Sequence, residues 1–502
     1  MTLFIVKNIG SEKNMATLQS IISSGSSLTF NQLKSDRSLT IEIQLKLANL
    51  GFYPGGGWID GDLGDSTSFT WTGLIDFCKR VGGVFQPSNT VAIDPSIAQQ
   101  LLDTQQVPAI LSDAANTSKI LDRLKAIQKD SPIVNIKAGI SSAFVSRTIN
   151  NSPIQTLIGN YPDNLEQKPD GIDIAFADSS AKLFTYPDLG DRPTIDDTGL
   201  DFLASNISHA CVCIGGFEDS TSSVKVRWFG RKSLDSVTLW WSTTKFIGML
   251  NTVCQINQKS ASTELKNCVI KSPRSSFTSL ARDMVNYQGK SSNAIGALFK
   301  SFTKREVLSA WIKAQTGNLN VDFRGSYGED PLISPATIED LTDSSFSLRS
   351  TSEGNASNSN QLAAYDLVRL ISMLGWHPHL TPKSQLPSAQ WESLKSIVQA
   401  MGNDTARYVD VALETLGLVN VISEPVIISK VGWGDSNSSG SMTYAAFVKF
   451  IDRRTNPGKL RTFALALRCP KNNSSDSFDF RDTRLAAAVT EIVRRIVTEE
   501  LA

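Results

Sequence analysis

The chain has 502 residues, of which 41% are hydrophobic and 20% charged, as is ordinary for a globular protein of two or more domains. Lysine plus arginine and aspartate plus glutamate are each 49, so the formal net charge is zero and gives no support for a nucleic-acid partner. No stretch approaches the roughly 18 consecutive apolar residues of a membrane helix. The N-terminus also lacks the basic-then-apolar layout of a secretory signal. We therefore expect a cytoplasmic protein, unless a leader was removed before residue 1, which leaves export open.

The six cysteines and three histidines limit the chemistry. The cysteines show no metal-ligand spacing, so we expect buried free thiols and neither a metal nor a cofactor. Cys211 and Cys213 are one residue apart in an apolar stretch and should share one face of a strand. None of His209, His377 and His379 lies in a recognisable catalytic context. If the protein is a hydrolase, we expect its base to be another residue type.

The N-terminal part predicts helices. Residues 1–34 are predicted to be an N-terminal leader with one short helix and a flexible Ser/Gly link. Residues 35–92 hold two helical patterns joined by LGFYPG and IDGDLGDST. This arrangement resembles the small peptidoglycan-binding-type domain of three helices. The resemblance implies a peptidoglycan-derived ligand, whereas the same residues would also serve simply to shape turns and helix caps.

The remaining organisation follows in chain order. Residues 93–195 are predicted to be a connector whose fold the pattern does not assign, with helical patterns at 95–106 and 117–130. Five later segments have strand patterns: 208–217, 223–230, 424–433, 444–452 and 460–469. Helices are predicted at 198–207, at 484–501 and through a long middle part that ends near residue 420. Strands at both ends with helices between them predict one antiparallel sheet with an inserted helical subdomain.

The stretch LWWSTTKFIGML, residues 239–250, places Ser242 three residues before Lys245 at the start of an apolar helix. Helical spacing puts the two side chains on one face, with the hydroxyl near the positive end of the helix dipole. Desolvation there would lower the lysine pKa, so that a neutral amine could accept the serine proton. A serine cap followed by a solvated lysine is the alternative. Three other Ser-x-x-Lys tetrads begin at Ser179, Ser222 and Ser301.

Two further stretches could complete such a site. In YQGKSSNAIGALF, Ser291 and Asn293 precede an apolar helix, where they could relay a proton and bind a substrate amide, or simply cap the helix. In IISKVGWGD, an apolar strand delivers Lys430 and then Gly432, at which a backbone can approach a ligand closely. The cation could hold a substrate carboxylate, tune the catalytic lysine or merely charge an edge strand.

In the order Ser-x-x-Lys, Ser-x-Asn and Lys-x-Gly, these motifs resemble those of the penicillin-recognising serine hydrolases, which include the class A β-lactamases and the penicillin-binding proteins. The resemblance covers residues 196–502. It singles out Ser242, because only this tetrad has two strands before it and both partner motifs after it. It implies an α+β, multi-domain protein with a β-lactamase-like antiparallel sheet flanked by helices.

The resemblance also implies a role for each matching position. Ser242 would be the acylated nucleophile and Lys245 its base. Ser291 would shuttle a proton, and Asn293 would orient the substrate amide. After the catalytic Lys430, the strand would bind substrate through Val431, Gly432 and Trp433. The backbone N–H groups of Ser242 and Trp433 would form the oxyanion hole.

Two departures from the family pattern matter. The family usually has threonine or serine where this chain has Val431, and the lost hydroxyl puts β-lactam recognition in doubt. Glu329 is the candidate deacylation base, although its surroundings, FRGSYGEDPLISP, do not match the family's local pattern. Without such a base, an acyl-enzyme formed with a β-lactam would break down slowly.

We therefore expect a serine hydrolase that acts through an acyl-enzyme on an amide, peptide or ester substrate. The peptidoglycan-binding-like module favours a cell-wall peptide as that substrate. Two alternatives stay open: a non-catalytic binding or scaffold protein that keeps the fold, and a true β-lactamase. The partner is expected to be a small molecule or a peptide, with no nucleic acid and no membrane segment, and the oligomeric state is left open.

Overall fold

The computed structural model describes residues 16–50, 52, 59–80, 87–102, 114–128, 142–159, 161–177, 182–235, 240–271, 273–351, 360–435, 440–473 and 475–501. The chain forms two compact units, Met1–Ile110 with Glu414–Asn420, and Leu111–Leu413 with Val421–Ala502. Within the described ranges, no helix has the length and apolar character needed to cross a membrane.

The first unit is helical within the described residues, as the sequence predicted. Its five described helices are α1 (Leu18–Ser24), α2 (Phe30–Ser35), α3 (Arg37–Asn49), α4 (Phe69–Arg80) and α5 (Pro95–Leu102). The helices α1, α3, α4 and α5 lie where helical patterns were predicted, whereas α2 was not predicted, and the three-helix layout of residues 35–92 is not confirmed. Apolar side chains outside 35–92, such as Leu18 and Leu101, are fully buried in the same core. Most of the predicted LGFYPG turn lies outside the described residues. The domain boundaries after residues 34, 92 and 195 remain predictions.

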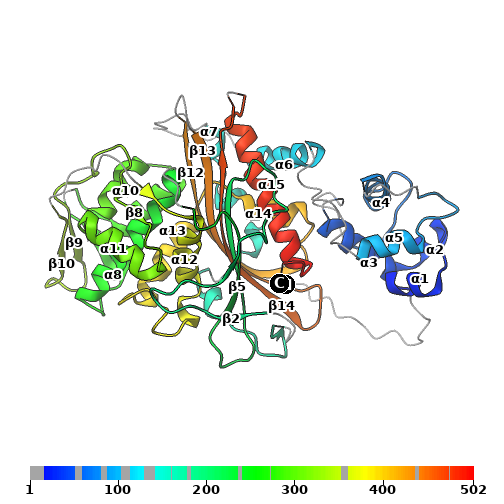
Figure 1. Cartoon of the computed structure of the whole chain (residues 1–502), viewed down its shortest axis with the longest axis horizontal. Helices are drawn as coiled ribbons and strands as arrows, with labels where there is room; N and C mark the ends of the chain where they lie inside the picture. The colour runs from blue at the N-terminus through cyan, green and yellow to red at the C-terminus, as the bar shows by residue number, and fades with distance from the viewer. Residues whose placement is uncertain are drawn as a thin grey trace. The chain divides into compact units, whose positions relative to one another are not determined.

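The second unit is built on one mixed sheet of eight strands, in the order β12-β13-β14-β4-β5-β2, with β1 beside β14 and β3 beside β5. All pairs along that order are antiparallel. The strands are β1 (Ile174–Ala175), β2 (Phe184–Thr185), β3 (Ile195–Asp196), β4 (His209–Gly216), β5 (Lys225–Arg231), β12 (Ile422–Asp435), β13 (Gly440–Asp452) and β14 (Gly458–Pro470). The five predicted strands are thus confirmed, and segments from both ends of the predicted region complete one sheet (Figure 1).

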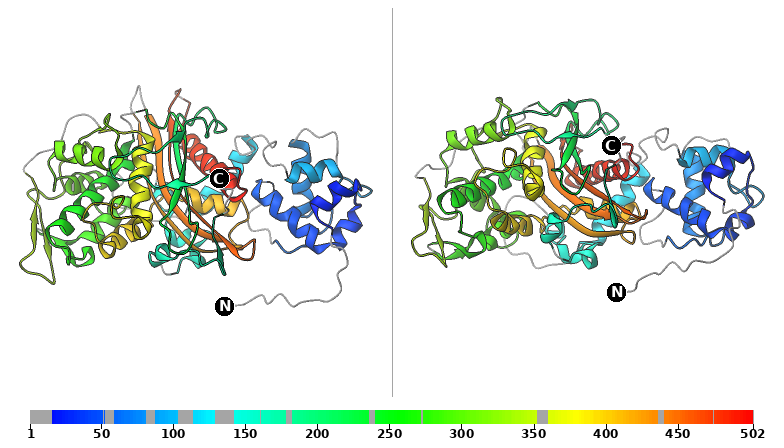
Figure 2. Two further views of the ribbon diagram at one scale, coloured as in Figure 1. Left: turned by 60° about the horizontal axis from the view of Figure 1, so that its bottom comes forward. Right: turned by 90° about the horizontal axis from the view of Figure 1, so that it is seen from below.

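Helices cover this sheet on both faces. Helix α12 (Ala364–Gly375) packs on β4, β13 and β14, and the closing helix α15 (Phe478–Val497) packs on β13 and β14. Figure 2 shows the orange strands between the yellow and red helices. Every residue of β13 is buried, as expected for a central strand with both faces covered. The predicted closing helix is therefore confirmed.

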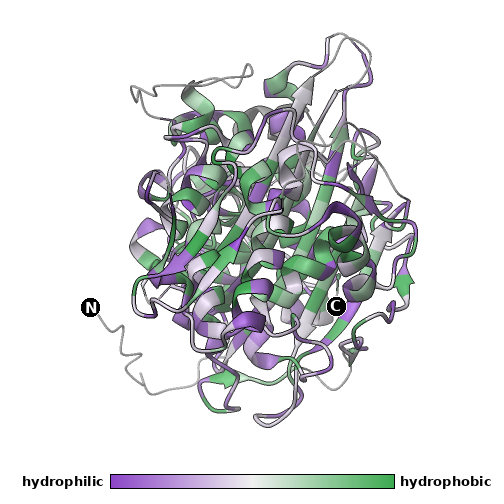
Figure 3. Ribbon diagram, turned by 90° about the vertical axis from the view of Figure 1, so that its left-hand side faces the viewer, coloured by the Kyte–Doolittle hydropathy of each residue, from purple (hydrophilic) through white to green (hydrophobic). Residues whose placement is uncertain are grey.

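The inserted part is mainly helical and carries the smaller strands. Its helices are α8 (Lys245–Lys259), α9 (Phe277–Asn286), α10 (Ser292–Lys300), α11 (Arg305–Thr316) and α13 (Trp391–Met401). Its short strands are β6 (Cys268–Ile270), β7 (Ser275–Ser276), β8 (Asp322–Phe323), β9 (Thr337–Asp340), β10 (Ser347–Arg349) and β11 (Asn360–Gln361). The unit also holds α6 (Ala114–Ala126), α7 (Ser142–Val145), α14 (Tyr408–Thr415), η5 (Asp163–Glu166), η6 (Trp241–Thr244) and η8 (His377–His379). Figure 3 shows polar and apolar residues alternating along the helices on this side.

The helix predicted at 198–207 was wrong. These residues form successive turns instead. The Arg231 guanidinium donates hydrogen bonds to the backbone carbonyls of Asp201, Leu203, Ala204 and Ile207. In a helix, each of these carbonyls would accept from the backbone N–H four residues later. Here the Arg231 side chain supplies the hydrogen bond instead, and the segment wraps around this arginine of β5.

Candidate functional site

Ser242 lies in the short helix η6, directly before α8. The residue ahead of it, Trp241, has a left-handed backbone with φ of 47°, which costs energy for a non-glycine residue. The Trp241 indole holds this conformation, since its Nε1 donates to Ser441 Oγ at 2.8 Å. Its ring packs on Gly434 of β12, where a Cβ would come within 2.3 Å of the ring. The sheet edge therefore positions the turn that presents Ser242.

Lys245 begins α8 and is 1% exposed. Its Nζ donates to Ser292 Oγ at 2.9 Å and to Asn293 Oδ1 at 2.7 Å, both neutral acceptors. Burial lowers the pKa of Lys245 well below its usual value, the Lys430 charge lowers it further, and Glu329 opposes the shift. The arrangement favours the neutral amine, which is the form that can accept a proton.

The second motif lies at the start of α10. Ser291 caps this helix, because its Oγ accepts from the Ala294 N–H at 3.5 Å. The same hydroxyl donates to Glu329 Oε2 at 2.5 Å. Ser291 therefore fits both interpretations of the sequence, as a cap and as a polar group of the site. Glu329 was expected from a poorly matching loop, and the structure places it beside Ser291 and near Lys245.

The third motif lies on β12, where Lys430 is fully buried. Its Nζ donates to the Val431 carbonyl at 2.8 Å and lies 3.9 Å from the centroid of the Tyr287 ring. Burial lowers the pKa of Lys430 to about 8, and attraction to Asp404 opposes this shift. Asp404, itself 1% exposed, accepts from Ser429 Oγ at 2.8 Å and from the Val431 N–H.

β12 is the edge strand of the sheet, and its open side faces η6. Both backbone groups of Val431 point to that open side, since its N–H bonds to Asp404 and its carbonyl accepts from the Tyr287 hydroxyl at 2.7 Å. Backbone groups alternate along a strand, so those of Trp433, two residues on, point the same way. At Gly432 a Cβ would lie 2.6 Å from the Thr243 nitrogen, so only glycine allows β12 and η6 to approach each other this closely. This geometry suits the predicted oxyanion hole, which remains a prediction.

Tyr287 connects the three motifs. Its hydroxyl is within hydrogen-bonding reach of the Ser242 side chain. Its ring centroid lies 5.8 Å from Lys245 Nζ and 3.9 Å from Lys430 Nζ, so that both amines face the aromatic ring. Tyr287 ends α9 with φ of 59°, a left-handed conformation that turns the chain toward the second motif. The nucleophile and both lysines expected from the sequence therefore gather around one aromatic side chain.

Three polar side chains of this site were not predicted. Ser292, rather than Ser291, accepts from Lys245 and donates to the Met284 carbonyl at 2.7 Å. Tyr287 stands four residues before Ser291, close enough to the motif to have been noticed as an aromatic hydroxyl. Asp404 precedes Lys430 by 26 residues, and no local pattern marks it as a partner.

The other Ser-x-x-Lys tetrads have different surroundings. In the tetrad that begins at Ser222, Lys225 forms an ion pair with Glu218 at the surface. In the tetrad that begins at Ser301, Lys304 is exposed. The serine of the tetrad at Ser179 lies outside the described residues. Burial of the lysine thus distinguishes Lys245 from Lys225 and Lys304, in addition to the order of motifs.

The histidines and cysteines are held in structural positions. Burial lowers the pKa values of His209, His377 and His379 to about 4, so that all three are neutral at pH 7. All six cysteines are buried and free, as expected. Cys211 and Cys213 both lie on β4, and their side chains belong to the same hydrophobic core. Among the residues that the structure describes, no group of three or more His, Cys, Asp or Glu side chains could hold a metal ion.

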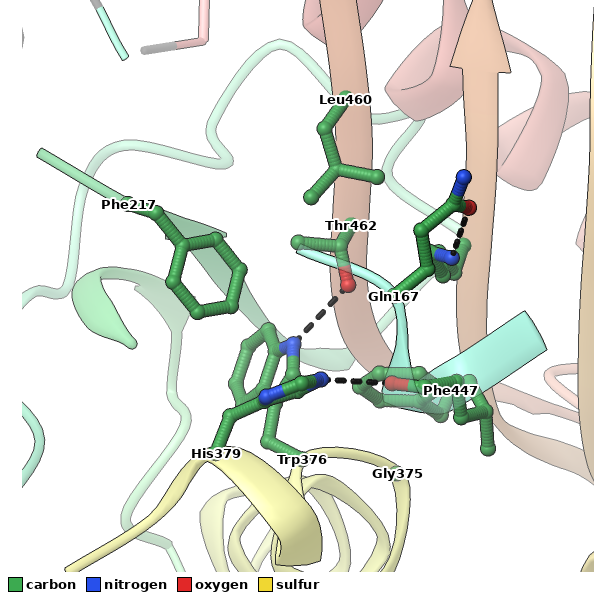
Figure 4. Close-up of a pocket in the computed structure, with 10 residues that line it drawn as sticks. Gln167, Phe217, Gly375, Trp376, His379, Phe447, Leu460 and Thr462 are labelled. Atoms are coloured by element: carbon green, nitrogen blue, oxygen red, sulfur yellow. Dashed lines mark hydrogen bonds between the residues drawn. The ribbon is translucent and has the colours of Figure 1, made fainter. Parts of the chain in front are cut away.

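A small cavity lies elsewhere in the second unit, between η8, β13 and β14 (Figure 4). Its volume is about 10 Å³, which suffices for one water molecule. His379 Nε2 bonds to the Leu165 carbonyl at 2.6 Å, and Trp376 Nε1 donates to Thr462 Oγ1 at 2.9 Å across it. None of its lining residues belongs to the three motifs, and its size excludes a substrate.

No protein-family model and no curated protein sequence matches the chain. Solved structures similar to it include the TLA-3 extended-spectrum β-lactamase, with 14% identity, coverage of 59% of this chain and 98% of that one, and a TM-score of 0.36. A β-lactamase from Xanthomonas campestris pv. campestris has 12% identity, coverage of 60% and 96%, and a TM-score of 0.35. A class D β-lactamase from Sebaldella termitidis has 12% identity, coverage of 60% and 99%, and a TM-score of 0.33. At these TM-scores the similarity carries no functional assignment, which depends on the side chains around Ser242.

Proposed function

We propose that the protein is a serine hydrolase that forms an acyl-enzyme on Ser242. The observation that supports this most is the buried Lys245 amine, whose pKa is lowered by burial and by the Lys430 charge, three residues after the serine. Its two hydrogen-bond acceptors are uncharged, so that neither stabilises the ammonium as a carboxylate would. A lysine in such surroundings serves as a general base for a neighbouring hydroxyl.

In the proposed reaction, neutral Lys245 takes the proton of Ser242 Oγ as the oxygen attacks the carbonyl carbon of an ester or amide. The backbone N–H groups of Ser242 and Trp433 stabilise the oxyanion of the tetrahedral intermediate. The Lys245 ammonium then gives up this proton, which Ser291 relays to the leaving alcohol or amine as the bond to the carbonyl carbon breaks, so that Lys245 is neutral again. Glu329 then takes a proton from a water molecule that attacks the acyl-enzyme and passes it to Ser242 Oγ as the bond between this oxygen and the acyl carbon breaks, which releases the acid and restores Ser242 and the Glu329 carboxylate.

A labelling experiment tests this proposal. The wild-type protein, Ser242→Ala and, as a matched control from another tetrad, Ser222→Ala are incubated with a fluorophosphonate or a fluorescent penicillin, and their intact masses are recorded. We expect an adduct on the wild type and on Ser222→Ala but not on Ser242→Ala. No Ser242-dependent adduct with either probe would contradict the proposal and favour the scaffold alternative.

The same experiment distinguishes the finer alternatives. A penicillin adduct that persists would identify a penicillin-binding protein, and one that turns over would identify a β-lactamase. An adduct with the phosphonate alone would identify an esterase or amidase. Within this proposal, the first unit remains a candidate peptidoglycan-binding-type module, which a pull-down with purified peptidoglycan would test.

A further inference from the structure

The cation of the third motif already has partners within the protein. Lys430 Nζ lies 3.9 Å from the centroid of the Tyr287 ring and donates to the Val431 carbonyl at 2.8 Å. Asp404 also attracts it, and this carboxylate accepts from Ser429 Oγ and from the Val431 N–H. The ring face, the carbonyl and the carboxylate each stabilise the ammonium, and the side chain is fully buried. A carboxylate of a substrate would have to reach this buried ammonium and compete with these partners.

The neighbouring strand position does not help to bind an anion. Val431 carries no hydroxyl, and its side chain is 1% exposed. Its N–H is bonded to Asp404, and its carbonyl accepts from both Lys430 and Tyr287. An anion at this edge would therefore meet a carbonyl oxygen and a buried carboxylate rather than donors.

The formal charges around Ser242 lead to the same conclusion. With Lys245 neutral, as the proposed mechanism requires, the groups named so far are the Lys430 cation and the carboxylates of Asp404 and Glu329, not counting Arg407, which pairs with Asp410 and also acts on Asp404. Their sum is −1, or zero if Asp404 takes up a proton. An anionic substrate gains nothing from this field, whereas a neutral substrate is unaffected by it.

The side chains next to the serine are largely aromatic. Trp241 precedes it, and Tyr287 reaches its hydroxyl. Tyr327 lies 5.6 Å from Lys245 Nζ, measured to its ring centroid. All three aromatic side chains are half-buried. Such surfaces bind apolar groups.

We infer that Ser242 takes an uncharged, apolar acyl group, so that the substrate is a neutral ester or amide rather than a β-lactam or a peptide with a carboxylate next to the scissile bond. In this arrangement Lys430 adjusts the electrostatics of Lys245 and does not bind a substrate carboxylate. Tyr287 and Asp404 are the positioning residues that hold it there. The inference rests on the proposed acyl-enzyme function.

Two esters of equal chain length test the inference, p-nitrophenyl valerate and the mono-p-nitrophenyl ester of glutaric acid. Both acyl groups contain five carbons. The valeryl group ends in a methyl group, and the glutaryl group ends in a carboxylate. We expect kcat/KM of the wild type to favour the valerate by about 30-fold at low salt, the size of a unit-charge interaction across such a site. Tyr287→Ala, which uncovers Lys430, should reduce the preference about tenfold, whereas Tyr287→Phe, which keeps the ring, should retain it.

A second variant keeps the test decisive if Tyr287→Ala does not fold. Asp404→Asn removes the carboxylate beside Lys430 and should raise the relative rate of the glutarate ester. Equal rates, or a preference for the glutarate ester in the wild type, would overturn the inference while Ser242-dependent hydrolysis still upheld the proposed function. No hydrolysis of either ester, together with no phosphonate adduct on Ser242, would overturn both.

Discussion

Two regions of the second unit bury cationic side chains, and the pKa of these side chains is lowered in one region and raised in the other. In the candidate site, Lys245 and Lys430 are almost fully buried, and the pKa of each is lowered. Near the end of α15, Arg494 is 1% exposed, yet its pKa is raised. Burial lowers the pKa in all three cases, but Arg494 also forms ion pairs with Glu491 and Glu500, at 2.8 Å and 2.6 Å, which outweigh it.

The difference lies in the partners. Arg494 makes two hydrogen bonds to each of two carboxylates, a geometry that suits its planar guanidinium and keeps the charge. Lys245 donates to a hydroxyl and an amide, so that its proton is held weakly. Burial with carboxylates therefore produces a structural cation, and burial with neutral acceptors produces an amine that can act as a base.

The largest expected effect is that of Lys245→Met. Loss of the base should slow acylation of Ser242 by a fluorophosphonate about 10³-fold. The melting temperature should stay the same or rise, because a lysine with neutral partners is costly to bury. Time-resolved intact mass and thermal unfolding measure the two quantities. Lys225→Met, from another tetrad, is the control and should retain the wild-type rate; a large loss of stability in Lys245→Met at an unchanged rate would contradict the comparison.

Arg494→Met should act on stability instead. Removal of the cation takes the two-fold hydrogen bonding of Arg494 away from the buried carboxylates of Glu491 and Glu500, which keep Arg495 and Thr498 as weaker partners, so we expect the free energy of unfolding to fall by about 3 kcal/mol. Urea unfolding measures this loss. Lys266→Met, which breaks an exposed pair with Glu264, should cost less than about 1 kcal/mol. The acylation rate of folded Arg494→Met, measured at low temperature, should remain within about twofold of wild type, and a larger loss would show that the two regions are not separate.

Glu329→Gln should separate the two halves of the proposed reaction. The amide cannot take a proton from water, so deacylation should slow about 10²-fold while acylation changes less. A burst of p-nitrophenol followed by slow turnover of p-nitrophenyl valerate would report this result. Asp330→Asn, an exposed neighbouring carboxylate, should leave both phases unchanged. Equal slowing of both phases in Glu329→Gln would assign Glu329 to acylation instead.

The smallest expected effect is on the pH dependence of acylation. An ammonium cannot accept a proton, so the rate should rise about tenfold per pH unit below the lowered pKa of Lys245 and level off above it. Lys430→Met removes a neighbouring positive charge that lowers this pKa. The pKa should therefore rise, and the midpoint of the profile should move to higher pH. A midpoint that moves to lower pH would contradict the role assigned to Lys430.

Much of the fold follows from local patterns. The strands β4, β5 and β12 to β14 and the closing helix α15 were predicted, because apolar runs bounded by turn residues report burial directly. The failed helix at 198–207 shows the limit of such patterns. Its apolar residues fit a helix, but Arg231, a residue of a later strand, binds the backbone carbonyls.

The candidate site divides in the same way. The spacing between Ser242 and Lys245 is a property of one turn of helix, so the sequence predicted this pair. The order of the motifs along the chain then predicted Ser291, Asn293 and Lys430. Tyr287 and Asp404 were missed because their contacts with Lys430 depend on how α9 and the segment before α14 pack against β12.

The sequence by itself determined which residue types stand at which helix and strand positions, since those depend on neighbours along the chain. Only the tertiary structure decided the charge state that those residues favour. The pKa of a lysine depends on what surrounds its amine in space. At Lys245 those surroundings come from α10 and β12, and at Lys430 they come from Tyr287 and Asp404, none of which the spacing of Ser-x-x-Lys could supply.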